Sequence, residues 1–215
     1  MSLAILYSRA QVGMDAPLVT VEVHLSNGLP GLSIVGLPET AVKESKDRVR
    51  GALLNSHFEF PMRRITINLA PADLPKEGGR FDLPIALGIL AASGQLPVQS
   101  LPDYEFAGEL ALSGELRPFH GVLPMTIHTQ RSGRTLVVPE DNAAEAALVG
   151  SARILAVRHL LDISAHLTGT CPLEPQVPNR VPPDEGPLPD LADVRGQHHA
   201  RRALEIAAAG APCIR

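Results

Sequence analysis

The segment from residue 74 to residue 94 constrains the fold more than any other part of this chain. It begins with a charged turn that contains Gly78 and Gly79, and glycine allows a tight backbone turn without a steric penalty. An apolar run, PIALGILAASG, follows over residues 84–94. Large apolar residues recur at helical spacing through this run and the leucine just before it. They are Leu83, Ile85, Leu87, Ile89 and Leu90. This pattern predicts a helix that is buried on most sides.

The charged turn lies where many folds place an active or binding site, but it lacks the residues of a catalytic site. A tight turn before a buried helix often holds a nucleophile or a phosphate. Here the turn carries Arg80, Phe81 and Asp82, none of which has a nucleophilic hydroxyl or thiol. We expect Arg80 or Lys76 to pair with Glu77 or Asp82 and so to fix the turn, because charged turn residues usually serve structure or solvation. A binding surface is the alternative, and we predict no catalytic residue and no metal site.

Elsewhere, alternating apolar and polar residues predict strands, most clearly over residues 19–25. With the strands expected at 3–8 and 32–36, this region predicts a small antiparallel meander. Pro38 and Glu39 suit the first turn of a helix over 40–54. Further strands are expected at 64–69, around Ser113–Gly114, at 135–138 and at 153–157, and further helices at 121–131, 143–149 and 160–167. This order of elements predicts an α+β or α/β two-layer domain over residues 1–168.

The remainder of the chain is organised differently. Residues 169–190 are rich in proline, which predicts a stiff, extended linker. Residues 191–215 follow, with a helix expected over 198–209. This lone amphipathic helix has nothing in its own segment to pack on, so we expect it to begin a second domain that the chain does not complete.

Composition narrows the functional classes. The formal net charge of −4 gives no global electrostatic case for nucleic acid, although it leaves room for a local basic patch. The two cysteines, Cys171 and Cys213, are too far apart to suggest a disulfide framework or a zinc site. No apolar run approaches the ~20 residues that span a bilayer, and no signal peptide is recognisable. We therefore expect a cytoplasmic protein with no membrane partner.

A run of basic residues on the helix predicted at 40–54 is the candidate surface for nucleic acid. The structural interpretation is a solvated helix face, because most runs of charged residues on a helix face the solvent. The sharper hypothesis is a strip that contacts DNA or a neighbouring subunit. The predicted DNA-binding residues are Lys43, Lys46, Arg48 and Arg50.

Three sequence blocks carry a resemblance to a known family. They are PLVTVEVHLSNGLPGLSIVGLPETAVKESKDRVRGAL, INLAPADLPKEGGRFDLPIALGILAASGQLP and PDLADVRGQHHARRALEIAAAG. The chain closely resembles the magnesium-chelatase-like AAA+ family as far as about Gly210. The resemblance implies a two-layer, Lon-protease-like (ribosomal-protein-type) domain ahead of an ATPase module that uses ATP and Mg²⁺. A competence-related member is described as a hexameric DNA helicase that promotes branch migration during natural transformation.

The resemblance also implies where nucleotide would lie. In AAA+ relatives, the residues that match Val194, Gly196 and Gln197 lie beside the adenine. The phosphate-binding G-x-x-x-x-G-K-[ST] loop, however, occurs nowhere in the 215 residues. We therefore expect no cofactor in this chain and no ATP hydrolysis by this chain alone.

The Lon-like part departs from an active protease. Arg80 stands at the position that resembles the Lon serine, and no lysine follows Gly121 where the general base is expected. The sequence therefore favours a non-catalytic module of an AAA+ ATPase, acting on branched or single-stranded DNA or in assembly of a homohexameric ring. The alternative is an enzyme, either a cryptic hydrolase on the Lon-like fold or a magnesium-chelatase-type ATPase component.

Overall fold

The computed structural model describes residues 2–36, 39–177 and 190–210, without the side chains of Thr40, Ala41 and Lys43. The chain divides into two compact units, residues 1–179 and residues 180–215, each of which is described by itself. The expected helical position of Pro38 and most of the predicted linker lie outside the described residues. No helix in the described part of the chain is long and apolar enough to cross a membrane.

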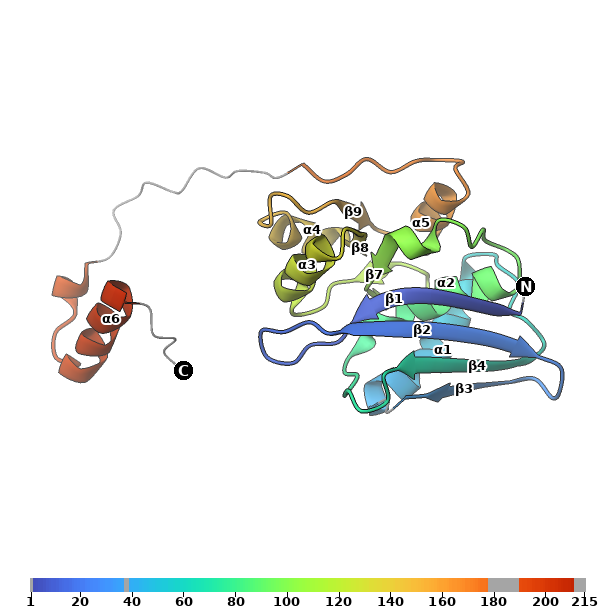
Figure 1. The fold of residues 1–215 in the computed structure, drawn as a ribbon, viewed down its shortest axis with the longest axis horizontal. Coiled ribbons are helices and arrows are strands. Elements are labelled where there is room, and N and C mark those ends of the chain that lie inside the picture. The colour runs from blue at the N-terminus through green and yellow to red at the C-terminus, as the bar shows by residue number, and fades with distance from the viewer. Residues whose placement is uncertain (1, 37–38, 178–189, 211–215) are drawn as a thin grey trace. The chain divides into compact units, whose positions relative to one another are not determined.

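The first unit is built on a four-stranded sheet in the order β1-β2-β4-β3 (Figure 1). Its strands are β1 (Leu3–Arg9), β2 (Leu18–Ser26), β3 (Gly31–Val35) and β4 (Arg64–Ala70). The predicted antiparallel meander is confirmed for β1 and β2, which pair antiparallel, but it is wrong for β3, because β4 lies between β2 and β3 and pairs with β3 in parallel. Parallel neighbours need a long crossover, which helix α1 (Thr40–Asn55) supplies between β3 and β4.

Helices α1 and α2 (Asp82–Ala92) cover one face of this sheet (Figure 1). The predicted inward positions of β2 are all buried, and they are Val19, Val21, Val23 and Leu25. Every residue of α2 is buried, which confirms the prediction from its apolar run. A Cβ atom at Gly88 would lie only 2.5 Å from Cγ2 of Val23, so this glycine permits the close approach of α2 to β2.

A second sheet of three parallel strands has the order β5-β8-β9. Strands alternate with helices along this part of the chain, as parallel pairing requires. Its elements are β5 (Tyr104–Phe106), α3 (Val122–Arg131), β8 (Thr135–Pro139), α4 (Glu140–Ala146), β9 (Ile154–Val157) and α5 (Leu160–Leu167). A short antiparallel pair, β6 (Glu109–Leu110) and β7 (Leu116–Arg117), lies around Ser113–Gly114 as expected. These mixed sheets and helices confirm the α+β class.

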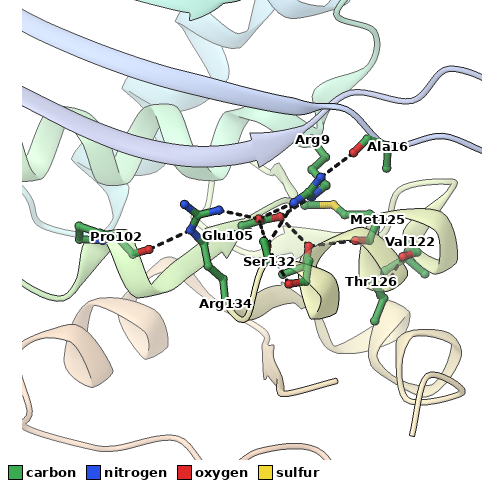
Figure 2. Close-up of polar contacts among 10 residues, drawn as sticks. Arg9, Ala16, Pro102, Glu105, Val122, Met125, Thr126, Ser132 and Arg134 are labelled. Atoms are coloured by element: carbon green, nitrogen blue, oxygen red, sulfur yellow. Dashed lines mark hydrogen bonds and ion pairs between the residues drawn. The ribbon is translucent and has the colours of Figure 1, made fainter. Parts of the chain in front are cut away.

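A buried polar network joins the two sheets (Figure 2). Glu105 on β5 is fully buried and accepts two hydrogen bonds from Arg9 on β1, at 2.6 and 2.8 Å. Thr129, Ser132 and Arg134 also donate to its carboxylate. Burial raises the pKa of Glu105, whereas its hydrogen bonds and the charge of Arg9 lower it. The lowering effects together are larger, so the pKa lies below its ordinary value.

The second unit contains a short 3₁₀ turn, η3 (Leu191–Asp193), and helix α6 (His198–Gly210). The helix begins at the predicted residue and ends one residue later than predicted. Neither element has a buried residue. Asp190 caps the 3₁₀ turn, because its side chain accepts a hydrogen bond from the backbone of Ala192.

Candidate functional site

The predicted basic strip on α1 divides between two faces of the helix. Lys46 and Arg50 are four residues apart and therefore share a face, whereas Arg48 lies between them and points elsewhere. Lys46 and Arg48 are half-buried, and Arg50 is exposed. Lys43 lies in α1, but its side chain is outside what the structure describes.

Arg48 points toward the buried start of α2. Its Nε lies 2.7 Å from Oδ2 of Asp82, and its Nη2 lies 3.2 Å from Oδ1. The hydroxyl of Ser45 and the backbone N–H of Leu110 also donate to this carboxylate. The hydrogen bond to Asp82 raises the pKa of Arg48 against the opposing effect of burial. Burial raises the pKa of Asp82, while Arg48 and Ser45 oppose that rise. The geometry is that of a structural ion pair between two helices.

Lys46 and Arg50 border a surface groove of about 250 Å³ between α1, the start of β3 and the loop of residues 60–62. The guanidinium carbon of Arg50 lies 5.1 Å from the centroid of the Phe60 ring, which is half-buried. We call this feature the α1–Phe60 groove. Its complete lining is Pro30, Gly31, Leu32, Lys46, Asp47, Arg50, Phe60, Pro61 and Met62.

The surroundings of the α1–Phe60 groove are basic and apolar. A neighbouring hollow, which shares Gly31 and Leu32 with the groove, is lined by Arg64 and by Leu29, which is 90% exposed. Met62 is 73% exposed. Asp47 contributes a carboxylate to the groove, so the lining is not purely cationic. The arrangement offers two positive charges beside an aromatic ring and apolar side chains.

The charges at the turn before α2 are not paired as the sequence suggested. The prediction that Asp82 pairs within the turn is wrong, because its partner is Arg48 on α1. Among the described residues, neither Arg80 nor Lys76 forms an ion pair with Glu77 or Asp82. Asp82 begins α2 and faces α1, so residues close to it in sequence do not face its carboxylate.

Lys76 has an environment that the sequence did not reveal. It is fully buried, and its Nζ donates a hydrogen bond to the backbone carbonyl of Pro71. Burial lowers the pKa of Lys76, and the negative charge of Asp73 raises it. Its ammonium group therefore anchors the turn to the loop that follows β4.

The residues predicted beside adenine lie together in the second unit. Val194, Gly196 and Gln197 form the turn between η3 and α6, where Gly196 and Gln197 have positive φ values of 75° and 52°. Arg201 donates to the backbone carbonyl of Val194 at 3.2 Å. Their role toward a nucleotide stays a prediction. Within the described part of the chain, no group of three or more His, Cys, Asp or Glu residues is placed to hold a metal ion.

A family comparison identifies the chain. The model of subunit ChlI of Mg-chelatase matches residues 21–142, which include the four-stranded sheet from β2 onward, α1, α2 and the turn. The chain belongs to this family. Within the ChlI family match lie both the α1–Phe60 groove and the Arg48–Asp82 pair.

Individual relatives agree with this assignment. The chain is 55% identical over 214 residues to competence protein ComM of Haemophilus influenzae, and 52% identical over 211 residues to an uncharacterized protein, YifB, of Salmonella typhimurium. Each match includes 98% of this chain. It spans only 42% of the length of ComM and 41% of the length of YifB. It is also 26% identical over 140 residues to the Lon protease of Mycolicibacterium smegmatis, of which it covers 18%.

Proposed function

We propose that this chain is a non-catalytic module of a ComM-like AAA+ ATPase and that it binds single-stranded DNA through the α1–Phe60 groove. The longer protein would act in the cytoplasm as a homohexamer that uses ATP and Mg²⁺ and processes branched DNA during natural transformation. The similarity to ComM and to the ChlI family supports the assignment to such a protein. The groove supports the more specific role of this chain.

The observation that carries the proposal is the stacking of Arg50 over Phe60 beside Lys46. Proteins that bind single strands without sequence preference combine a basic groove, which follows the backbone, with aromatic rings on which bases stack. Here both components occur at one surface position. A guanidinium already held over a ring also presents its N–H groups without a large entropy cost on binding.

The surrounding side chains favour a single strand over a duplex. Unpaired bases expose apolar faces, and Met62 and Leu29 offer exposed apolar surface around the groove. A duplex keeps the faces of its bases stacked inside and would present only its phosphates and the edges of its bases. The formal charge of −4 opposes binding elsewhere on the chain, so the contact should be local and salt-sensitive.

The experiment is binding of the 215-residue chain to a fluorescent single-stranded oligonucleotide and to a duplex of the same length. We expect the single strand to bind more tightly. The double variant Lys46→Ala/Arg50→Ala should weaken single-strand binding by about tenfold or more, since two charged contacts are lost. The matched control is Arg131→Ala, which removes an exposed arginine at the end of α3 and should leave binding unchanged.

Failure to bind single-stranded DNA at low salt would contradict the proposal. Equal loss of binding in Arg131→Ala and in the groove variant would also contradict it, because the contact would then be diffuse. In either case the α1–Phe60 groove would have no special role, and assembly of the ATPase ring would become the better hypothesis for this module.

A further inference from the structure

Two arginines are buried to nearly the same extent but have different surroundings. Arg9 is 6% exposed and binds the carboxylate of Glu105 with two hydrogen bonds. Arg80 is 9% exposed, yet its acceptors are neutral: Oε1 of Gln11 at 3.1 Å and the carbonyl oxygen of His120 at 3.0 Å. A buried cation is normally paired with an anion, so Arg80 requires an explanation.

The guanidinium of Arg80 retains unused donors. Both of its hydrogen bonds come from Nη2, and among the described residues neither Nε nor Nη1 has an acceptor. Three of its five N–H groups therefore have no acceptor in the part of the chain that the structure describes. Its guanidinium carbon lies 5.3 Å from the ring centroid of Phe119, which gives partial compensation for the charge. Burial lowers the pKa of Arg80, and the negative charge of Glu77 raises it.

These donors line a cavity of about 450 Å³, which we call the Arg80 cavity. Arg80 and Gly79 are its buried residues, whereas Gln11, Glu77 and His120 are exposed at its mouth. The full lining is Gln11, Glu77, Gly78, Gly79, Arg80, Glu109, Pro118, Phe119 and His120. A buried cation thus forms the floor of an open cavity.

Two glycines leave the space that shapes the Arg80 cavity. A Cβ atom at Gly79 would lie 2.4 Å from Oε2 of Glu109, and one at Gly121 would lie 2.1 Å from Oε1 of Gln11. Side chains at these positions would displace the carboxylate in the wall or the amide that holds Arg80. Gly121 also has a φ of 82°, which favours glycine.

Charges of both signs line the Arg80 cavity. Arg80 is its buried cation, Glu77 is an exposed carboxylate and Glu109 is a half-buried one. Glu109 is only loosely paired, with Nη1 of Arg117 at 3.9 Å. A simple anion would meet Arg80 favourably but would pass two carboxylates. A ligand that carries both a carboxylate and an ammonium group would match both kinds of charge.

We propose that the Arg80 cavity binds a small amino carboxylic acid. Its carboxylate would accept hydrogen bonds from Nε and Nη1 of Arg80, and its ammonium group would lie between Glu77 and Glu109. The cavity lies at the turn before α2, whereas the α1–Phe60 groove lies on the outer face of α1. The two proposals therefore rest on separate residues.

The test is a titration of the ¹⁵N-labelled 215-residue chain, followed through the side-chain Nε–H signal of Arg80. The probes are glycine, β-alanine and 4-aminobutyrate, with acetate and methylammonium as single-charge controls at matched ionic strength. We expect a saturable shift with at least one amino acid and weaker binding of acetate. Glu77→Gln should weaken the best amino acid about 2- to 5-fold, as the loss of an exposed ion pair predicts. Glu145→Gln, an exposed carboxylate on α4, is the matched control and should change nothing.

Glu77 is exposed, so its substitution tests the cavity without disturbing the core. The proposal is overturned if no amino acid gives a saturable shift of the Arg80 signal. It is also overturned if acetate binds as tightly as every amino acid, or if Glu77→Gln has no more effect than Glu145→Gln.

Discussion

The two faces of α1 use the same kind of residue for different purposes. On the inner face, Arg48 reaches a fully buried carboxylate, Asp82, and ties α1 to α2. On the outer face, Lys46 and Arg50 border an open groove beside Phe60. A run of basic residues on one helix is therefore not one site. The location of a carboxylate in the fold decides which cation is structural and which remains available for a ligand.

The largest effect on stability should come from a second buried ion pair, between Arg9 and Glu105. Its loss provides a reference value for the cost of removing a buried charged partner. Glu105→Gln removes the carboxylate that Arg9 and Arg134 share, and it leaves a buried cation without its anion. We expect the free energy of unfolding to fall by about 3–5 kcal/mol. Chemical denaturation measures this change, and a loss below about 1 kcal/mol would contradict the structural role of the network.

The same variant should alter the acid sensitivity of the chain. The pKa of Glu105 is lowered from its ordinary value of 4.5, so its stabilisation is present above that pH. The contribution is lost as the pH falls below 4.5 through the lowered pKa of the folded state. Unfolding curves recorded against pH should be less steep in this range for Glu105→Gln than for the wild type. Identical slopes would show that the carboxylate does not titrate as the geometry implies.

The next largest effect separates the two faces of α1 directly. Among the described residues, Arg48→Ala leaves the buried Asp82 with Ser45 and a backbone donor, so stability should fall by about 3 kcal/mol. Lys46→Ala, on the outer face, should change stability by no more than about 0.5 kcal/mol. Thermal or chemical denaturation of both variants distinguishes the faces. Similar losses in the two variants would contradict the division.

A smaller effect concerns the aromatic component of the groove. Phe60→Leu keeps an apolar residue but removes the ring on which Arg50 lies and on which we expect a base to stack. Single-strand affinity should fall by about fivefold, which corresponds to about 1 kcal/mol of lost stacking. The affinity of the same variant for a duplex should not change. An equal loss for single strand and duplex would assign the binding to charge alone.

The elements could be predicted from local patterns, but their neighbours could not. The alternation of apolar and polar residues in β2 indicates a half-buried strand, and the apolar run of α2 indicates a buried helix. Each pattern is typical of one kind of element and of its burial. The order of the strands depends on how β3, α1 and β4 cross over, and no local pattern records that. The meander was therefore the natural prediction, and it was wrong for β3.

The same limit applies to the sites. The basic residues of α1 were recognisable as candidates, but only the fold separates Arg48 from Lys46 and Arg50. The pairing of Arg48 with Asp82 joins residues 34 positions apart, so sequence neighbours of Asp82 were the wrong candidates. The available signal was a charged residue at the start of an otherwise apolar helix, because a buried carboxylate requires a cation as its partner.

The most direct test of the account is the salt dependence of single-strand binding. The slope of log K against log salt concentration should be compared for the wild type, Lys46→Ala/Arg50→Ala and Arg48→Ala, after circular dichroism has shown that each is folded. We predict that the slope becomes shallower by about 1.4 in the double variant, since two phosphate contacts are lost, and stays unchanged in Arg48→Ala. A slope that is unchanged in the double variant, or equally reduced in Arg48→Ala, would contradict the division of α1 into a structural face and a binding face.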